Sequence, residues 1–329
     1  MKLAVTVITG FLGSGKTTLI NSILSGNHGK KIAIIENEFG EVGVDDGLVL
    51  QSQEEVVEMN NGCICCTVRG DLIKILHKLL QRSDPLDAII IETTGLADPA
   101  PVAQTFFVDE YLQANMRLDG IITVVDAKHV IQHLDEEKDE GVENESVEQI
   151  AFADRIILNK LDLVSPEELA CVKKRIKAIN TPASIYETTH SQVPLQEILD
   201  IRAFELDRIM DMDPEFLNPD QDHQHDESVQ SVGIECEGEC DIDKLEVWLS
   251  ALLQNFGNDI FRSKGLLAIQ GSPHRHVFQG VHMMLGMGSS ANGHGRPWAP
   301  GETRTNRLVF IGRNLNRKAL NDSFRKCLV

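Results

Sequence analysis

The chain has 329 residues, 42% of them hydrophobic and 25% charged, and no apolar run approaches the roughly 18 residues that a membrane-spanning helix needs. The length suggests two domains, and the composition excludes a disordered tail and a mini-protein that depends on disulfide staples. The 31 Lys and Arg residues against 50 Asp and Glu residues give a formal net charge of −19, which disfavours binding to nucleic acid or to an anionic membrane through charge.

Residues 3 to about 205 alternate short β-branched apolar runs with helical periods, which predicts a doubly wound α/β domain. The strand cores are nearly continuous in Val and Ile, as in a mostly parallel sheet with helices on both faces. The spacing of Ser165 and Glu168 is that of a capping box, so a helix is expected over 166–179. The expected strands are Leu3–Thr9, Lys31–Glu36, Ala88–Glu92, Gly120–Val125 and Arg155–Asn159.

A solvated linker is predicted over 207–228, where eight acids stand against one base and where His223 and His225 form a His-x-His sequence. After the linker the pattern predicts a β-α-β-β-β-α order. The expected elements are the strands Val229–Glu235, Gly265–Gln270, His276–Met284 and Arg307–Gly312, and the helices Ile242–Asn255 and Arg317–Cys327. We therefore divide the chain into a first domain over 1–206, the linker, and a small α+β domain over 229–329.

Two further expectations concern this second domain. The first of its helices should bury one apolar face, which consists of Leu245, Leu249, Leu252, Leu253 and Phe256. The stretch Ser289–Gly295 is expected to be a flexible loop.

The strongest motif is Gly10-Phe-Leu-Gly13-Ser14-Gly15-Lys16-Thr17-Thr18, which fits G-x-x-x-x-G-K-[ST] between a predicted strand and a predicted helix. Its glycines let the backbone wrap around a phosphate so that successive N–H groups point inward. Lys16 is expected to reach the β and γ phosphates, and Thr17 to ligate Mg²⁺. The motif therefore predicts a nucleotide site.

The base of that nucleotide is indicated by Asn159-Lys160-Leu161-Asp162, which fits N-K-x-D at the carboxyl end of an apolar strand. The Asp162 carboxylate can accept hydrogen bonds from the N1–H and 2-amino groups of guanine, a donor pair that adenine lacks. We therefore expect GTP, bound with Asn159, Lys160 and Asp162 at the base.

A third nucleotide motif, Ile89-Ile-Ile-Glu92-Thr-Thr-Gly95, also ends a strand. Glu92 is expected to hold the Mg²⁺ shell and the Gly95 N–H to sense the γ-phosphate. Leu96, rather than a water-orienting Gln, follows Gly95. The sequence thus predicts a GTPase whose hydrolysis of GTP to GDP and phosphate is slow without metal or a partner.

Three of the seven cysteines, Cys63, Cys65 and Cys66, fall within four positions. This clustering is not a secreted disulfide framework and indicates a reducing compartment. Three thiolates would suit Zn²⁺, with another ligand in the fourth position. The alternative is three buried, apolar thiols.

Other metal candidates are weaker. Glu36 and Glu41 either complete a metal shell or belong to a solvated acidic loop. His223 and His225 either collect metal transiently or are simply solvated. The pairs His274 with His276 and Cys236 with Cys240 are taken as structural.

Together these motifs resemble the CobW family of metallochaperone GTPases, through GFLGSGKTT, IENEFG, NGCICC, IETTGLADP and NKLD, then VFQGVH and RTNRLVFIGRNL. The likeness is strongest to the eukaryotic branch, which includes plant plastid members and zinc-regulated GTPase metalloprotein activators, and Glu92 is the family's own variation. The resemblance implies Mg²⁺-dependent GTP hydrolysis, Zn²⁺ held by the Cys-x-Cys-Cys motif, and transfer of the metal to a client metalloenzyme.

The leading hypothesis is therefore a GTP-driven Zn²⁺ chaperone. A regulatory GTPase switch with structural or redox-sensing cysteines is the alternative. A phosphotransferase is disfavoured because no Arg cluster lies near the phosphate motifs. We expect a cytoplasmic protein, or a plastid one if a transit peptide was removed, with no nucleic-acid or membrane partner and with a homodimer as one option.

Overall fold

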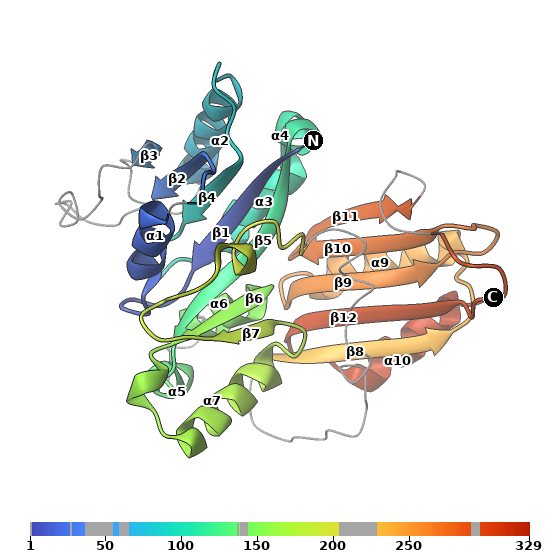
Figure 1. Cartoon of the computed structure of the whole chain (residues 1–329). Helices are drawn as coiled ribbons and strands as arrows, with labels where there is room; N and C mark the ends of the chain where they lie inside the picture. The colour runs from blue at the N-terminus through green and yellow to red at the C-terminus, as the bar shows by residue number, and fades with distance from the viewer. Residues whose placement is uncertain are drawn as a thin grey trace. The chain divides into compact units, whose positions relative to one another are not determined.

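The computed structural model describes residues 2–26, 28–36, 55–58, 66–136, 138, 144–203, 229–290 and 297–329, with only the backbone for 55–58 and 66–69. They form two compact units, Met1–Arg175 with Ala183–Arg202, and Ile176–Pro182 with Ala203–Val329 (Figure 1). The predicted linker, with His223 and His225, lies outside the described residues, as does most of the predicted Ser289–Gly295 loop. Every helix in the described ranges is too short or too polar to cross a bilayer.

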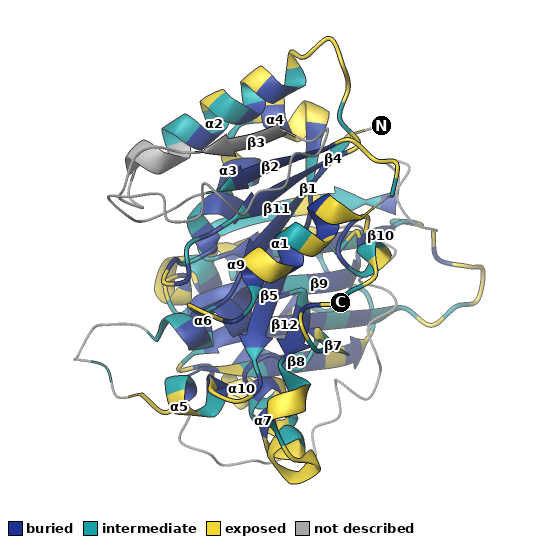
Figure 2. Cartoon of the chain, turned by 60° about the vertical axis from the view of Figure 1, so that its left-hand side comes forward, coloured by how far each residue is buried: buried dark blue, intermediate teal, exposed yellow. Residues whose placement is uncertain are grey.

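The first unit is built on a seven-stranded sheet in the order β3-β2-β4-β1-β5-β6-β7, and each described neighbouring pair is parallel (Figure 1). Its strands are β1 Leu3–Thr9, β2 Ile32–Glu36, β3 Glu55–Glu58, β4 Ala88–Glu92, β5 Met116–Asp126, β6 Arg155–Asn159 and β7 Ser184–Glu187. The central strands are almost fully buried (Figure 2). The five strands expected from the sequence are therefore present, while β3 and β7 are additional.

Helices flank both faces of this sheet (Figure 1). They are α1 Lys16–Ser25, α2 Cys66–Leu80, α3 Ala100–Val108, α4 Glu110–Asn115, α5 Val130–Leu134, α6 Glu145–Phe152 and α7 Pro166–Ile179. The capping box that was predicted before α7 is confirmed, since Ser165 N donates to Glu168 Oε2 at 2.7 Å and Glu168 N donates to Ser165 Oγ at 3.2 Å.

The order of the strands indicates which edge of the sheet binds ligands. The chain leaves β1 toward one side of the sheet through β2 and β4 and continues on the other side through β5, so the order reverses at β1. Ligands of such sheets bind at the carboxyl ends of the strands beside this reversal. Adjacent strand ends lie in register there, with Ile8 opposite Glu92 and Asp126 opposite Asn159.

The second unit contains a five-stranded antiparallel sheet in the order β11-β10-β9-β12-β8. Its strands are β8 Val229–Glu237, β9 Ile260–Ala268, β10 Arg275–Val281, β11 Met284–Ser289 and β12 Thr305–Arg313. The helices α9 Ile242–Phe256 and α10 Arg317–Phe324 lie behind the sheet in Figure 1.

Two expectations for this unit are wrong. The predicted strand 276–284 is a hairpin, because His282 adopts a φ of 50° and lets β10 turn back into β11 without a glycine. Phe256 is 47% exposed, because it closes α9 and lies beyond the part of the helix that the sheet covers. Trp248 packs on the core cluster from the same helix.

Candidate nucleotide site

The loop between β1 and α1 needs its glycines. The φ angles of Gly10, Gly13 and Gly15 are 140°, 71° and 111°, a region that side chains disfavour. A Cβ on Gly10 would lie 2.2 Å from Val124 O, and one on Gly15 would lie 2.4 Å from Asn159 Nδ2. The loop is therefore closely packed against β5 and against the loop after β6.

Lys16 opens α1 and points back into this loop. It is 7% exposed, and its Nζ donates to Gly10 O at 2.8 Å and to Phe11 O at 3.3 Å. Burial lowers the pKa of Lys16 below its usual range, and the Glu92 carboxylate opposes that shift.

The remaining groups of the loop fit a phosphate ligand. The Ser14 hydroxyl is buried and has no hydrogen-bond partner among the described residues. Thr17 and Thr18 are exposed on the first turn of α1, where the helix N-terminus favours anions. The loop therefore offers an ammonium, a buried hydroxyl and a helix start to one bound group.

Asn159, at the end of β6, joins the phosphate loop to the loop after β7. Its Nδ2 donates to Ser14 O at 3.0 Å and to Ser191 Oγ at 2.9 Å, and its Oδ1 accepts from Ser191 N at 2.9 Å. Ser191 Oγ in turn donates to Gly15 O at 3.0 Å. The amide of Asn159 is thus occupied in positioning loops, while Asp162 is exposed on the short 3₁₀ helix Leu161–Leu163 and can face a base.

The loop after β7 also reaches this site, although no sequence motif predicts it. His190 and Ser191 have φ angles of 54° and 52°, although neither is a glycine, and Thr188 Oγ1 donates to Gln192 O at 2.8 Å. Strained backbone of this kind clusters at ligand sites. The available signal was the short strand β7, since any strand of this sheet sends its following loop to the same edge.

Lys160 is held across the sheet edge by Asp126. Lys160 has a φ of 63°, and its Nζ donates to Asp126 Oδ2 at 2.7 Å. Asp126 also binds His129 Nδ1 at 2.9 Å and accepts from Lys128 N. Burial raises the pKa of Asp126, but the hydrogen bonds from Lys160, His129 and Lys128 outweigh it, and the net pKa is lowered.

Glu92 and Gly95 lie on the other side of the phosphate loop. Glu92 is half-buried at the end of β4 and lies in register with Glu36 of β2. Carboxylate and hydroxyl oxygens are ligands that Mg²⁺ prefers, so Glu92 and Thr17 fit the predicted cation by their chemistry. Leu96, which follows Gly95 in place of a water-orienting Gln, is 53% exposed.

Comparison with known proteins decides the family. The model of the CobW/HypB/UreG nucleotide-binding domain matches residues 4–187, and that of the cobalamin synthesis protein cobW C-terminal domain matches residues 229–328. The chain belongs to the CobW/HypB/UreG family. The resemblance inferred from the motifs is confirmed.

Known proteins align with all or part of this CobW-type chain. Zinc chaperone YjiA of Escherichia coli is 38% identical over 327 residues, 98% of each chain. Zinc-regulated GTPase metalloprotein activator 1 of Schizosaccharomyces pombe is 44% identical over 207 residues, 61% of this chain and 49% of that protein. The crystal structure of Zn(II)-bound YjiA GTPase from E. coli superposes with a TM-score of 0.78 at 31% identity over 100% of both chains. The P-loop GTPase fold predicted from the sequence is therefore confirmed.

The metal-ligating residues predicted for this CobW-type chain are placed only in part. Cys63, Cys65 and Glu41 lie outside the described residues, and Cys66 is described by its backbone alone, as the first residue of α2. Glu36 ends β2 beside Glu92. Among the residues that the structure describes, no three His, Cys, Asp or Glu side chains are grouped to hold a metal ion.

The weaker candidates in the second unit agree with a structural role. Cys236 and Cys240 are buried free thiols, and burial raises the pKa of Cys240 to about 12. His274 Nδ1 and His276 Nε2 bind the hydroxyls of Ser290 and Ser272, at 3.1 and 2.9 Å. These side chains support one another within the fold.

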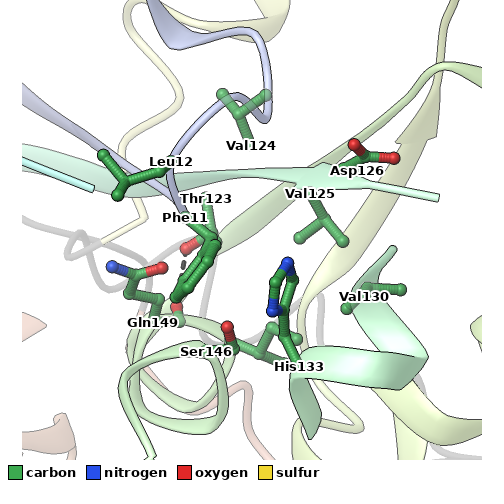
Figure 3. Close-up of a pocket in the computed structure, with 11 residues that line it drawn as sticks. Phe11, Leu12, Thr123, Val124, Val125, Asp126, Val130, His133, Ser146 and Gln149 are labelled. Carbon is green, nitrogen blue, oxygen red and sulfur yellow. Dashed lines mark hydrogen bonds between the residues drawn. The ribbon is translucent and has the colours of Figure 1, made fainter. Parts of the chain in front are cut away.

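A small pocket lies beneath the phosphate loop (Figure 3). Phe11 and Leu12 of the loop line it together with His133 of α5 and Gln149 of α6. The rings of Phe11 and His133 lie against each other in a tilted contact, with an interplanar angle of 34° and centroids 4.0 Å apart. Because Phe11 O also accepts a hydrogen bond from Lys16, this contact supports the loop from below.

Proposed function

We propose that the chain is a GTP-hydrolysing metallochaperone that binds Zn²⁺ through Cys63-Ile64-Cys65-Cys66 and transfers it to a client metalloprotein. The observation that carries the proposal is the hydrogen-bond network around Asn159, which joins the end of β6 to the phosphate loop and to the loop after β7. It occurs in a chain of which 98% aligns with a zinc chaperone. The chain acts in the cytoplasm, or in a plastid after removal of a transit peptide.

The nucleotide roles follow from position. Lys16 neutralises phosphate charge from inside the loop, and the exposed Asp162 reads guanine. Thr17 and Glu92 hold Mg²⁺, which supplies charge neutralisation at the phosphates when it is bound. Hydrolysis is slow in the isolated chain because Leu96 cannot orient water.

Zinc is cargo in this proposal, and GTP can drive its transfer only if the zinc affinity differs between the GTP and GDP states. The described helices offer a route for that difference. Helix α2 begins at Cys66 and packs against α3 and α4, where His77 Nε2 lies 3.3 Å from Asp109 Oδ1. Helix α3 begins shortly after Gly95. Movement of the Gly95 turn on GTP binding would therefore be passed through α3 to α2, the helix that begins at Cys66.

The deciding experiment measures zinc affinity by competition with a chromophoric chelator, with the chain loaded with GDP or with a non-hydrolysable GTP analogue. We expect a difference of at least about tenfold, which corresponds to roughly 1.4 kcal/mol of coupling. Cys65→Ser should abolish stoichiometric zinc binding. Cys171→Ser, which removes an exposed free thiol on α7, is the matched control and should bind zinc normally.

Two results would contradict the proposal. Equal zinc affinity in the two nucleotide states removes the driving force for transfer. Unchanged zinc stoichiometry in Cys65→Ser assigns the cysteines a structural or redox role and favours the regulatory switch. Client identity can then be approached by co-purification with the GTP-locked chain and metal analysis of the captured protein.

A further inference from the structure

A buried glutamine contacts the turn that carries Gly95. Gln149 lies on α6 and is 1% exposed. Its Nε2 donates to Gly95 O at 3.0 Å and to Ala97 O at 3.3 Å, across more than 50 residues of sequence. In Figure 3 its amide lies at the wall of the pocket near Leu12. A buried amide is stable only when it is hydrogen-bonded, so its orientation is fixed by these two carbonyls.

The opposite side of the same turn rests on the phosphate loop. A Cβ added to Gly95 would lie 2.6 Å from Leu12 Cδ2 and 2.7 Å from Leu12 N. The backbone of Gly95 is therefore packed between Leu12 of the phosphate loop and the amide of Gln149. Small displacements of this turn would break one contact or the other.

Gln149 is itself anchored to the sheet. Thr123 Oγ1 on β5 donates to Gln149 O at 2.6 Å, and Thr123 lies in register with Thr9 at the end of β1. Asn144 caps α6, since its Oδ1 accepts from Ser146 N at 3.0 Å and from Val147 N at 3.2 Å. The amide thus projects from a fixed support.

We propose that Gln149 is the positioning residue that holds the Gly95 turn where its N–H can meet the γ-phosphate of GTP. The inference rests on the proposed function and on the contact with the γ-phosphate that the sequence predicts for the Gly95 N–H. It adds that discrimination between GTP and GDP depends on a side chain outside every recognisable nucleotide motif. Because GDP lacks the γ-phosphate, its affinity should not depend on Gln149.

The test compares GTP-analogue and GDP affinities of the full chain by fluorescence titration with labelled nucleotides. Gln149→Met keeps the side-chain volume and removes both hydrogen bonds. We expect about a tenfold loss of affinity for the GTP analogue, with GDP affinity unchanged within about twofold. Gln113→Leu is the matched control, since its exposed amide also donates to a backbone carbonyl, Phe107 O at 2.8 Å, and it should alter neither affinity.

If Gln149 had a merely structural role, Gln149→Met would lower the affinities for GTP analogue and GDP alike, or would only lower the unfolding temperature. An unchanged ratio of GTP to GDP affinity, or a raised affinity for the GTP analogue, overturns the inference while leaving the proposed function standing. Failure of the unmodified chain to bind GTP overturns both. If Gln149→Met does not bind GDP, Gln149→Glu decides by the same ratio, because its carboxylate has the same shape but cannot donate to both carbonyls.

Discussion

Each unit contains a buried asparagine that uses its whole amide inside the protein, and the two differ in what they join. Asn159 connects the end of β6 to two loops, the phosphate loop and the loop after β7, at the carboxyl edge of a parallel sheet. Asn306, fully buried on β12, accepts from Ala268 N at 2.9 Å and from the Cys240 thiol at 3.3 Å, and donates to Gly238 O at 2.9 Å. The same chemistry organises a ligand site in the first unit and a core in the second, because only the first lies where loops converge.

Replacement of Asn159 should give the largest effect. Asn159→Ala removes three hydrogen bonds and takes from Ser14 O and from the Ser191 N–H the partner that Asn159 supplies, so we expect GTP and GDP affinities to fall by roughly two to three orders of magnitude. Titration with labelled nucleotides measures this loss. Asn115→Ala, which removes an exposed amide bonded to Tyr111 O, is the control. A loss below about threefold would show that the loops hold their positions without Asn159.

Replacement of Asn306 should act on stability alone. Asn306→Ala takes from the Ala268 N–H and from Gly238 O the partner that Asn306 supplies, and we expect about 2 kcal/mol less free energy of unfolding. Denaturant unfolding of the full chain measures it, with Asn255→Ala on the exposed face of α9 as control. Nucleotide affinity should stay the same, and a parallel fall in GTP affinity would contradict the separation between the two networks.

Acid should destabilise the second unit through His282. Burial, and then Arg313, lower the pKa of His282 to about 4, against about 6.5 for an unperturbed histidine. Between these values the unfolded chain binds more protons, so stability falls as the pH falls from 6.5 toward 4. Between pH 7 and pH 5 we expect the free energy of unfolding of His282→Gln to fall by roughly 1–2 kcal/mol less than that of the unmodified chain. Denaturant unfolding at the two pH values measures this difference. An equal fall in the free energy of unfolding of His282→Gln and of the unmodified chain would contradict this prediction.

Loosening Lys160 should give the smallest effect. Asp126→Asn keeps an acceptor for Lys128 N but removes the ion pair with Lys160, and we expect about a threefold loss of GTP and GDP affinity alike. Lys128→Met breaks a neighbouring exposed pair with Glu168 and serves as control. If the losses of binding free energy in Lys160→Met and Asp126→Asn simply add in the double variant, the two side chains do not act together.

The parts of the site that could be predicted are those with a dense local pattern. The phosphate loop and Asn159-Lys160-Leu161-Asp162 are contiguous motifs, and the structure places both at strand ends as expected. Their roles in catalysis and binding remain predictions. The strongly β-branched strands were predictable because burial on both faces leaves a continuous apolar run.

Gln149 and Ser191 could not be predicted, for a physical reason. Each is a single polar residue in a segment whose pattern predicts only a helix or a loop, and each acts through a contact more than 30 residues away. The turn at His282 was missed for a related reason, since tertiary packing imposes a positive φ on a residue that carries no turn signal. The periodicity of a sequence indicates which residues are buried. The roles of Gln149, Ser191 and His282 depend instead on which distant segments of the chain contact one another.

The three glycines of the phosphate loop differ in how far they can be substituted. A Cβ on Gly13 would meet nothing within 4 Å, so among these restrictions only its φ of 71° applies, and Asn is the replacement that this φ favours. Gly10 and Gly15 are restricted by φ and also by neighbours that a single extra carbon would strike. The pattern G-x-x-x-x-G-K-[ST] fixes those two positions and leaves the third open. The two glycines that the motif requires are therefore those whose Cβ would collide with Val124 and Asn159, two residues far along the chain.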